Sequence, residues 1–119
     1  MAMAEIGNLS PQQLIDAEAR GVKIIDIRTS PEWQQTGVIK SANKITFFNA
    51  SGTPMVDSFM SEFQKIVSDK NQEFILVCRS GARTAAVANF LSEQLGYLNV
   101  SHLAHGMNSW LSSNLPVEY

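Results

Sequence analysis

Short apolar runs alternate with amphipathic segments along nearly the whole length of this chain. The apolar runs are rich in β-branched and aromatic residues and are bounded by glycine, proline or polar turns, a pattern that predicts strands. The segments between them carry apolar residues at helical spacing. Strands that alternate with helices predict a parallel sheet with helices on both faces. The expected strands are residues 22–28, 44–46, 73–77 and 100–104, and the expected helices are residues 11–20, 31–36, 58–67, 84–95 and 106–114.

The length of 119 residues suits a single domain, which we expect to span residues 1–119. A net charge of −2, with cations spread along the chain, does not resemble a nucleic-acid-binding surface. One cysteine cannot form an internal disulfide, a CxxC redox pair or a cysteine-rich zinc site. No apolar run approaches the ~20 residues of a membrane span, and the first residues show no signal-peptide pattern. We therefore expect a cytoplasmic protein without nucleic-acid or membrane partners, present as a monomer or a weak homodimer.

The single cysteine, Cys78, follows the most apolar expected strand, residues 73–77, and precedes an expected helix. Ligands of parallel α/β sheets bind just beyond the carboxyl ends of the strands, which is where this order places the thiol. The thiolate is the nucleophilic form of cysteine, and an unperturbed thiol needs about 2.7 kcal/mol of preferential stabilisation to be mostly thiolate at neutral pH. A helix N-terminus supplies only about 0.3–1 kcal/mol, so a reactive cysteine needs further donors and charges.

The segment CRSGARTA, which begins at Cys78, offers such groups. Gly81 permits a positive φ angle, so the loop can curl its amides inward, while two guanidinium groups add charge and two hydroxyls add donors. A lone cysteine after an apolar strand is more often a core residue. Arginines beside it would be costly to bury, however, which favours the catalytic interpretation with Cys78 as nucleophile. We expect a cradle around its sulfur formed by Arg79, Ser80, Gly81, Ala82, Arg83 and Thr84.

Four polar side chains outside this loop are weaker candidates. Asp26 and Arg28 lie near the end of an expected strand, and we expect mainly structural roles for them. In this interpretation Asp26 accepts hydrogen bonds from loop amides, and Arg28 pairs with Glu32. His102 is expected to point outward from its short strand into solvent, and His105 is expected to cap the last helix or to line the cleft.

Three segments resemble the rhodanese-like domain family and together span the whole chain. IIDIRTSPEWQQTGVI is similar to the family's Asp-x-Arg, Glu-aromatic and Gly-x-Ile segment, CRSGARTA to its active-site loop, and LAHGMNSWLSSNLPVE to its closing segment. Val38 stands where the family often has histidine, and His105 replaces the first glycine of a Gly-Gly pair. The resemblance implies a three-layer α/β fold with a five-stranded parallel sheet and helices on both faces.

The resemblance also implies a thiosulfate sulfurtransferase that works by double displacement. The Cys78 thiolate would take a sulfane sulfur from thiosulfate or another donor, and the persulfide would pass it to an acceptor such as cyanide or a thiol. The amides of Arg79 to Thr84 would hold the persulfide, and Arg79 and Arg83 would attract an anionic donor. No metal or organic cofactor is implied. The expected partners are a small sulfur donor and acceptor, or a protein persulfide as donor.

Two alternatives remain open at this point. A persulfide carrier or interaction module that serves a partner protein would use the same cysteine. Cysteine phosphatases and arsenate reductases share this type of fold, but phosphatases use a Cys-x5-Arg loop. The spacing here, from Cys78 to Arg83, is Cys-x4-Arg and makes a tighter ring, which fits a sulfur atom better than a phosphoryl group.

Overall fold

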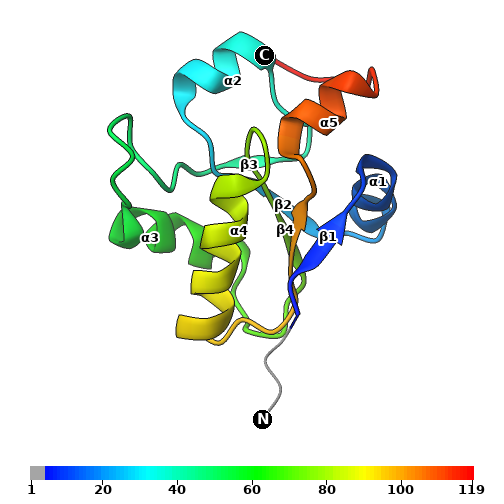
Figure 1. Cartoon of the computed structure of the whole chain (residues 1–119). Helices are drawn as coiled ribbons and strands as arrows, with labels where there is room; N and C mark the ends of the chain where they lie inside the picture. Colours follow the sequence, from blue (N-terminus) through cyan, green and yellow to red (C-terminus); the bar gives the residue numbers. More distant parts are fainter. Residues whose placement is uncertain (1–4) are drawn as a thin grey trace.

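Five parallel strands form one sheet in the computed structural model, which describes residues 5–119 (Figure 1). Their order across the sheet is β1-β5-β4-β2-β3, so β4 lies at the centre between β5 and β2. This arrangement confirms the expected α/β class with a parallel five-stranded sheet. The strands are β1 (Gly7–Leu9), β2 (Lys23–Asp26), β3 (Asn43–Lys44), β4 (Phe74–Val77) and β5 (Val100–Leu103).

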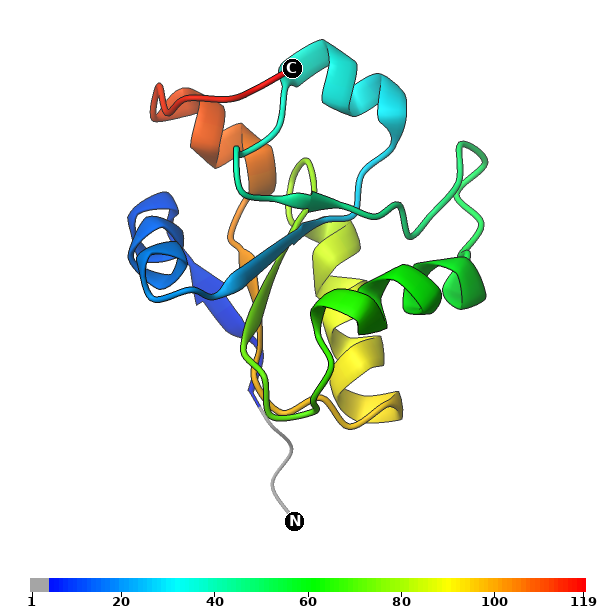
Figure 2. The ribbon, with the colours of Figure 1, turned by 180° about the vertical axis from the view of Figure 1, so that it is seen from behind.

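Helices cover both faces of the sheet, and one helix lies beyond the carboxyl ends of its strands. Helices α3 and α4 lie on one face and α1 and α5 on the other, while α2 lies beyond the carboxyl ends of the strands (Figures 1 and 2). The chain therefore has the three layers that the alternation predicted. The helices are α1 (Pro11–Ala19), α2 (Ser30–Thr36), α3 (Val56–Ile66), α4 (Ala82–Asn89), continued by the π-helical turn η1 (Phe90–Gln94), and α5 (Gly106–Ser112). Within the described residues, none of these helices has the length and apolarity needed to cross a membrane.

The core consists of two apolar clusters separated by the sheet. All four residues of β4 are buried, because helices cover the strand on both sides, and this explains its unbroken apolar sequence. Phe74 and Leu76 pack in the cluster with α3 and α4, whereas Ile75 and Val77 pack in the cluster with α1 and α5. The central strand is thus held on both faces, and its carboxyl end is a fixed base for the loop that follows.

The structure adds one strand to those expected and shortens the others. β1 pairs in parallel with β5, with Asn8 opposite His102. Its sequence, Gly-Asn-Leu, has low strand propensity, so pairing with β5 rather than local preference makes it a strand. The helix expected over residues 84–95 begins two residues earlier, at Ala82, and ends in η1.

Candidate active site

Cys78 follows β4 directly and begins the loop that leads into α4. In Figure 1 this loop lies between α2 and α5, at the edge where the strands end. The Cys78 side chain is fully buried, and its Sγ accepts a hydrogen bond of 3.1 Å from the Gly81 amide. Gly81 has a φ of 99°, in the left-handed region, and a Cβ there would lie 3.2 Å from the backbone nitrogen of His105. Glycine at this position therefore allows both the curl of the loop and its close approach to the next segment.

The sulfur has fewer polar neighbours than the sequence predicted. Among the described residues, the Gly81 amide is the only backbone N–H hydrogen-bonded to Sγ, whereas the Ala82 amide lies 3.5 Å from Ser80 Oγ. The Thr84 hydroxyl supplies a second contact, with Oγ1 3.4 Å from Sγ. The rest of the surroundings is apolar, because Cys78 also belongs to the cluster beneath α3 and α4. The sulfur thus lies at the boundary between an apolar core and two polar groups, the Gly81 amide and the Thr84 hydroxyl.

A line of hydrogen bonds continues from Thr84 across the sheet. Thr84 Oγ1 lies 2.7 Å from His102 Nδ1, and His102 Nε2 lies 2.7 Å from Asn8 Oδ1. The expectation that His102 points into solvent is wrong, since its relative exposure is 7%. β5 lies inside a sheet covered on both faces, so no outward side exists for this residue. Burial lowers the pKa of His102, and electrostatic repulsion from His105 lowers it further.

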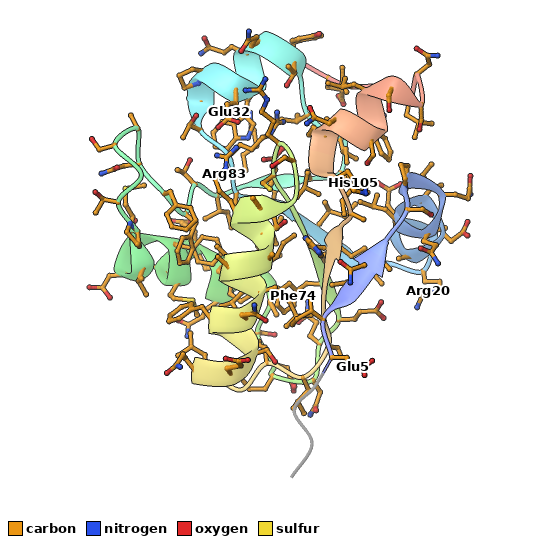
Figure 3. All side chains as sticks on the ribbon, in the orientation of Figure 1. Glu5, Arg20, Glu32, Phe74, Arg83 and His105 are labelled. Atoms are coloured by element: carbon orange, nitrogen blue, oxygen red, sulfur yellow. The ribbon has the colours of Figure 1, made fainter. Side chains whose placement is uncertain are left out.

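Arg83 reaches from α4 to Glu32 on α2. Its two terminal nitrogens donate to the two carboxylate oxygens of Glu32 at 2.9 and 2.7 Å, and the pair lies between these helices (Figure 3). The hydrogen bonds from Arg83 lower the pKa of Glu32 from 4.5 to about 2, against the opposing effect of burial. The same bonds raise the pKa of Arg83. The Arg83 guanidinium is therefore committed to α2, and sequence analysis missed this because the two residues are far apart in the chain.

Asp26 and Arg28 form a second, fully buried ion pair. Arg28 donates from Nε and from a terminal nitrogen to the Asp26 carboxylate, the latter at 2.8 Å. Its remaining donors reach Thr36 Oγ1 and the Gly37 carbonyl, both at 2.8 Å. The expected pairing of Arg28 with Glu32 is not formed. The Asp26 carboxylate accepts from the Arg28 side chain and also, at 3.0 Å, from the Arg28 backbone amide in the loop after β2. This pair joins the end of β2 to the end of α2.

The N-terminus of α5 holds the Cys78 loop from the other side. The Met107 amide donates to the Cys78 carbonyl at 2.8 Å, and the Asn108 amide donates to the Arg79 carbonyl at 3.0 Å. His105 precedes the helix with a φ of 62°, and its side chain makes no capping hydrogen bond. These two bonds use free amides of a helix start to fix two successive peptide groups of the loop.

Two hollows flank the Glu32–Arg83 pair. The first, of about 100 Å³, is lined by Arg28, Glu32 and the exposed Arg79, with residues of α2 and α5 around them. The second, of about 520 Å³, is also lined by Glu32, together with Arg83, Phe48 and residues of the loop at 49–52. Ser80 and Ala82 of the Cys78 loop are exposed to solvent. The described residues contain no group of three or more histidine, cysteine or carboxylate side chains that would hold a metal ion.

Comparison with known proteins gives a consistent result. The model of the rhodanese-like domain matches residues 10–113. A sulfurtransferase from Allochromatium vinosum is 32% identical over 106 residues, which cover 89% of this chain and 85% of that protein. This match and the family model support a sulfurtransferase-type function in general.

Solved structures share the fold. The human single-domain sulfurtransferase superposes with a TM-score of 0.66 at 22% identity, covering 91% of this chain and 97% of that chain. A protein of unknown function from Rhodopseudomonas palustris, described as a possible tyrosine phosphatase, superposes with a TM-score of 0.71 at 25% identity, covering 95% of this chain and 85% of that chain.

Proposed function

Because this chain belongs to the rhodanese-like domain family, we propose that it is a sulfurtransferase that moves a sulfane sulfur from thiosulfate, or a related donor, through a persulfide on Cys78. The observation that carries the proposal is the position of Sγ at the start of α4. This atom accepts a hydrogen bond from the Gly81 amide and contacts the Thr84 hydroxyl. Both groups stabilise a negative charge on sulfur, and so does the positive end of the helix. A thiolate and a persulfide each carry such a charge.

The reaction has two displacement steps. In the first, the Cys78 thiolate attacks the outer sulfur of thiosulfate, a sulfur–sulfur bond forms to Cys78, and sulfite leaves with the electron pair of the broken bond. The persulfide anion then remains on the loop. In the second step, cyanide or a thiolate attacks the outer persulfide sulfur, and the electron pair returns to Cys78. Charge balances in each step, so no cofactor is required.

Arg79 is the cation that we assign to recognition of the anionic donor. Its side chain is exposed and lines the first hollow, whereas Arg83 is held by Glu32. The Cys78 sulfur is fully buried and lines neither hollow, so a donor reaches it only after side chains around the loop move. Glu32 lines both hollows and is hydrogen-bonded to Arg83, so we expect this pair to be among the groups that move.

The proposal is tested by incubating the purified protein with thiosulfate and measuring its intact mass. We expect a gain of one sulfur atom, released as thiocyanate when cyanide is added. Cys78→Ser is the matched control, because it keeps the shape of the side chain and removes the nucleophile. If the wild-type protein gains no sulfur, or the variant gains as much, the proposed activity is wrong.

Assays on the same purified protein distinguish two other possible functions from the proposed one. A persulfide carrier would gain sulfur from a protein donor but would turn over thiosulfate and cyanide poorly, so steady-state rates with a panel of donors distinguish it. A phosphatase would hydrolyse a chromogenic phosphate ester in a manner that depends on Cys78. We expect no such hydrolysis, because Arg83, the arginine that would bind the phosphoryl group, is already paired with Glu32 in a short Cys-x4-Arg loop.

A further inference from the structure

The hydrogen-bonded line from Cys78 through Thr84 and His102 to Asn8 has a defined direction. Asn8 Oδ1 is a carbonyl oxygen and can only accept, so His102 Nε2, at 2.7 Å, carries a proton. In the neutral imidazole, Nδ1 is then the acceptor. The Thr84 hydroxyl has a single proton and two acceptors, the Gly81 carbonyl at 3.2 Å and His102 Nδ1 at 2.7 Å, and the shorter contact assigns the proton to His102. The Thr84 oxygen is left to accept, and the neutral Cys78 thiol donates to it over 3.4 Å.

An anionic sulfur reverses part of this line. A thiolate or persulfide can only accept, so the Thr84 hydroxyl turns its proton toward Cys78. His102 Nδ1 then faces an oxygen without a proton to offer, and the contact is restored only when Nδ1 gains a proton. Asn8 continues to accept from Nε2 in both states. Negative charge on Cys78 is therefore linked to positive charge on His102.

We propose that His102 is a positioning residue that takes up the proton of the Cys78 thiol through the Thr84 hydroxyl and remains protonated while the persulfide is present. The inference rests on the proposed function and assigns the proton acceptor of the same site. The S–H proton moves to Thr84 Oγ1 as the hydroxyl proton moves to Nδ1, so the products are a thiolate, an intact hydroxyl and an imidazolium. Proton number and charge balance, and no further reactant is needed.

The other charged groups around the loop do not replace His102 in this role. On β2 and α2, the carboxylates of Asp26 and Glu32 are each bonded to an arginine. His105 makes no hydrogen bond to Thr84 or Cys78 among the described residues and affects His102 only by electrostatic repulsion. Arginine side chains stay protonated and cannot accept the proton. The titratable and charged groups that face the loop are Asp26, Arg28, Glu32, Arg79, Arg83, His102 and His105.

Burial fits His102 to this task. It favours the neutral imidazole while the sulfur is uncharged, which agrees with the lowered pKa of His102. The same low dielectric strengthens attraction between an imidazolium and an anionic sulfur once both are present. The two charges are thus expected to appear and disappear together.

The first test measures the imidazole resonances of wild-type protein by NMR as a function of pH. The chain has two histidines, so His105→Asn assigns the remaining signal to His102. Asparagine tolerates the left-handed backbone of that position. We expect His102 in the persulfide form to titrate about one pH unit or more above its position in Cys78→Ser, where no anion forms, a tenfold or larger change in proton affinity. The same titration in both forms would overturn the proposal.

The second test uses His102→Asn, whose amide can still accept from Thr84 but cannot take up a proton. We expect the ultraviolet absorbance of the thiolate to appear at higher pH, and kcat/KM near neutral pH to fall about tenfold and to recover in alkaline solution. His105→Asn is the matched histidine control: it keeps His102 and removes the repulsion from His105, so we expect the thiolate absorbance to appear at the wild-type pH or below it, with no loss of rate at neutral pH. An equal loss of rate at every pH would show a purely structural role and overturn the proposal.

Failure of this inference can be told from failure of the proposed function. The thiolate absorbance is measured without any sulfur donor, so it reports on His102 even if the protein never accepts sulfur from thiosulfate. Conversely, sulfur uptake with an unchanged thiolate titration in His102→Asn would retain the proposed function and reject the inference. Thermal unfolding verifies that His102→Asn is folded. If this variant does not fold, the NMR test still decides the proposal, because it is made on protein that retains His102.

Discussion

At the scale of single residues, Thr84 has more possible partners than one hydroxyl can serve as a donor. Its Oγ1 lies 3.4 Å from Cys78 Sγ, 3.2 Å from the Gly81 carbonyl and 2.7 Å from His102 Nδ1. One O–H can donate to only one of these at a time. The side chain is fully buried, so water cannot replace a lost bond. The direction of this hydroxyl therefore responds to the charge on the sulfur.

Thr84→Val is expected to reduce sulfur transfer from thiosulfate at neutral pH by about tenfold or more, because it removes the hydroxyl and keeps the shape. It should also destabilise the fold by about 1–3 kcal/mol, since His102 Nδ1 loses its buried partner. Rates and urea denaturation measure the two effects. Thr84→Ser keeps the hydroxyl and should retain most of the activity; a serine variant as inactive as the valine variant would contradict the role of the hydroxyl.

The Glu32–Arg83 pair should give the folded state a distinct acid dependence. The pKa of Glu32 in the fold is about 2, below its ordinary value of 4.5, so the pair stabilises the fold fully above pH 4.5 and loses this contribution as the pH falls toward 2. Glu32→Gln should cost about 1–3 kcal/mol at neutral pH. Denaturation at several pH values should show the difference from wild type shrinking in this acid range.

A matched surface pair provides the control for that measurement. Glu62 and Lys65 form an ion pair whose side chains are mostly exposed, so Glu62→Gln is expected to change stability by less than about 1 kcal/mol at any pH. If the loss caused by Glu32→Gln stayed constant down to the lowest pH at which the protein folds, the carboxylate would not be the source of the stabilisation.

At the scale of secondary-structure elements, the start of α5 and the Cys78 loop approach each other more closely than a side chain would permit. Gly106 has a φ of 55°, and a Cβ on it would lie 2.3 Å from the Cys78 carbonyl oxygen and 2.7 Å from Arg79 backbone atoms. The two hydrogen bonds that α5 donates to the loop depend on this approach. The helix thereby fixes the two peptide groups that directly follow Cys78.

Gly106→Ala is expected to destabilise the protein by several kcal/mol and to abolish most sulfur loading, because either α5 or the loop must move. Gly21→Ala is the matched control, with a φ of 89° and no atom within 4 Å of the added Cβ. It carries the backbone cost of about 1–2 kcal/mol without the collision. Chemical denaturation and intact mass after thiosulfate treatment measure both variants, and equal effects would show that the close approach is unimportant.

Much of the element order can be predicted from the sequence because it is written in local patterns. β4 is an apolar run, and Gly21, Gly37 and Gly96, which follow helical segments, all have positive φ angles. β1 has no such pattern, since it becomes a strand only by pairing with β5. This pairing also makes β5 an inner strand of a sheet covered on both faces, so the burial of His102 could not be inferred from strand alternation.

At the scale of the whole molecule, the site is assembled by contacts between distant parts of the chain. Glu32 and Arg83 are separated by 51 residues, and Asn8 and His102 by 94. The segment CRSGARTA indicates a reactive cysteine because Cys78, Gly81 and Thr84 are close in sequence. The groups that we propose to control protonation of the sulfur and donor access to it, His102 and the Glu32–Arg83 pair, are distant from Cys78 in sequence or paired with distant residues. No local pattern could therefore identify them before the sheet order was known.

The buried Asp26–Arg28 pair tests how far the site depends on this assembly. Arg28→Met leaves the Asp26 carboxylate without its partner in the interior and also frees Thr36 and Gly37, so we expect a loss of about 3–5 kcal/mol. Arg20→Met removes an arginine whose partner, Glu73, is at the surface, and should cost less than about 1 kcal/mol. Urea denaturation compares the two arginine variants directly.

A double variant, Asp26→Leu with Arg28→Met, separates the charge from the connection it makes. Replacement of both members of a buried pair by apolar residues often restores stability. If Arg28 acts only by neutralising Asp26, stability and sulfur loading should both recover. If its bonds to Thr36 and Gly37 are needed to hold α2, and with it Glu32, then stability should recover while sulfur loading stays low. We expect the second result, because Arg28 is the side chain that bonds the end of β2 to the end of α2, and full recovery of loading would show that α2 holds its place without it.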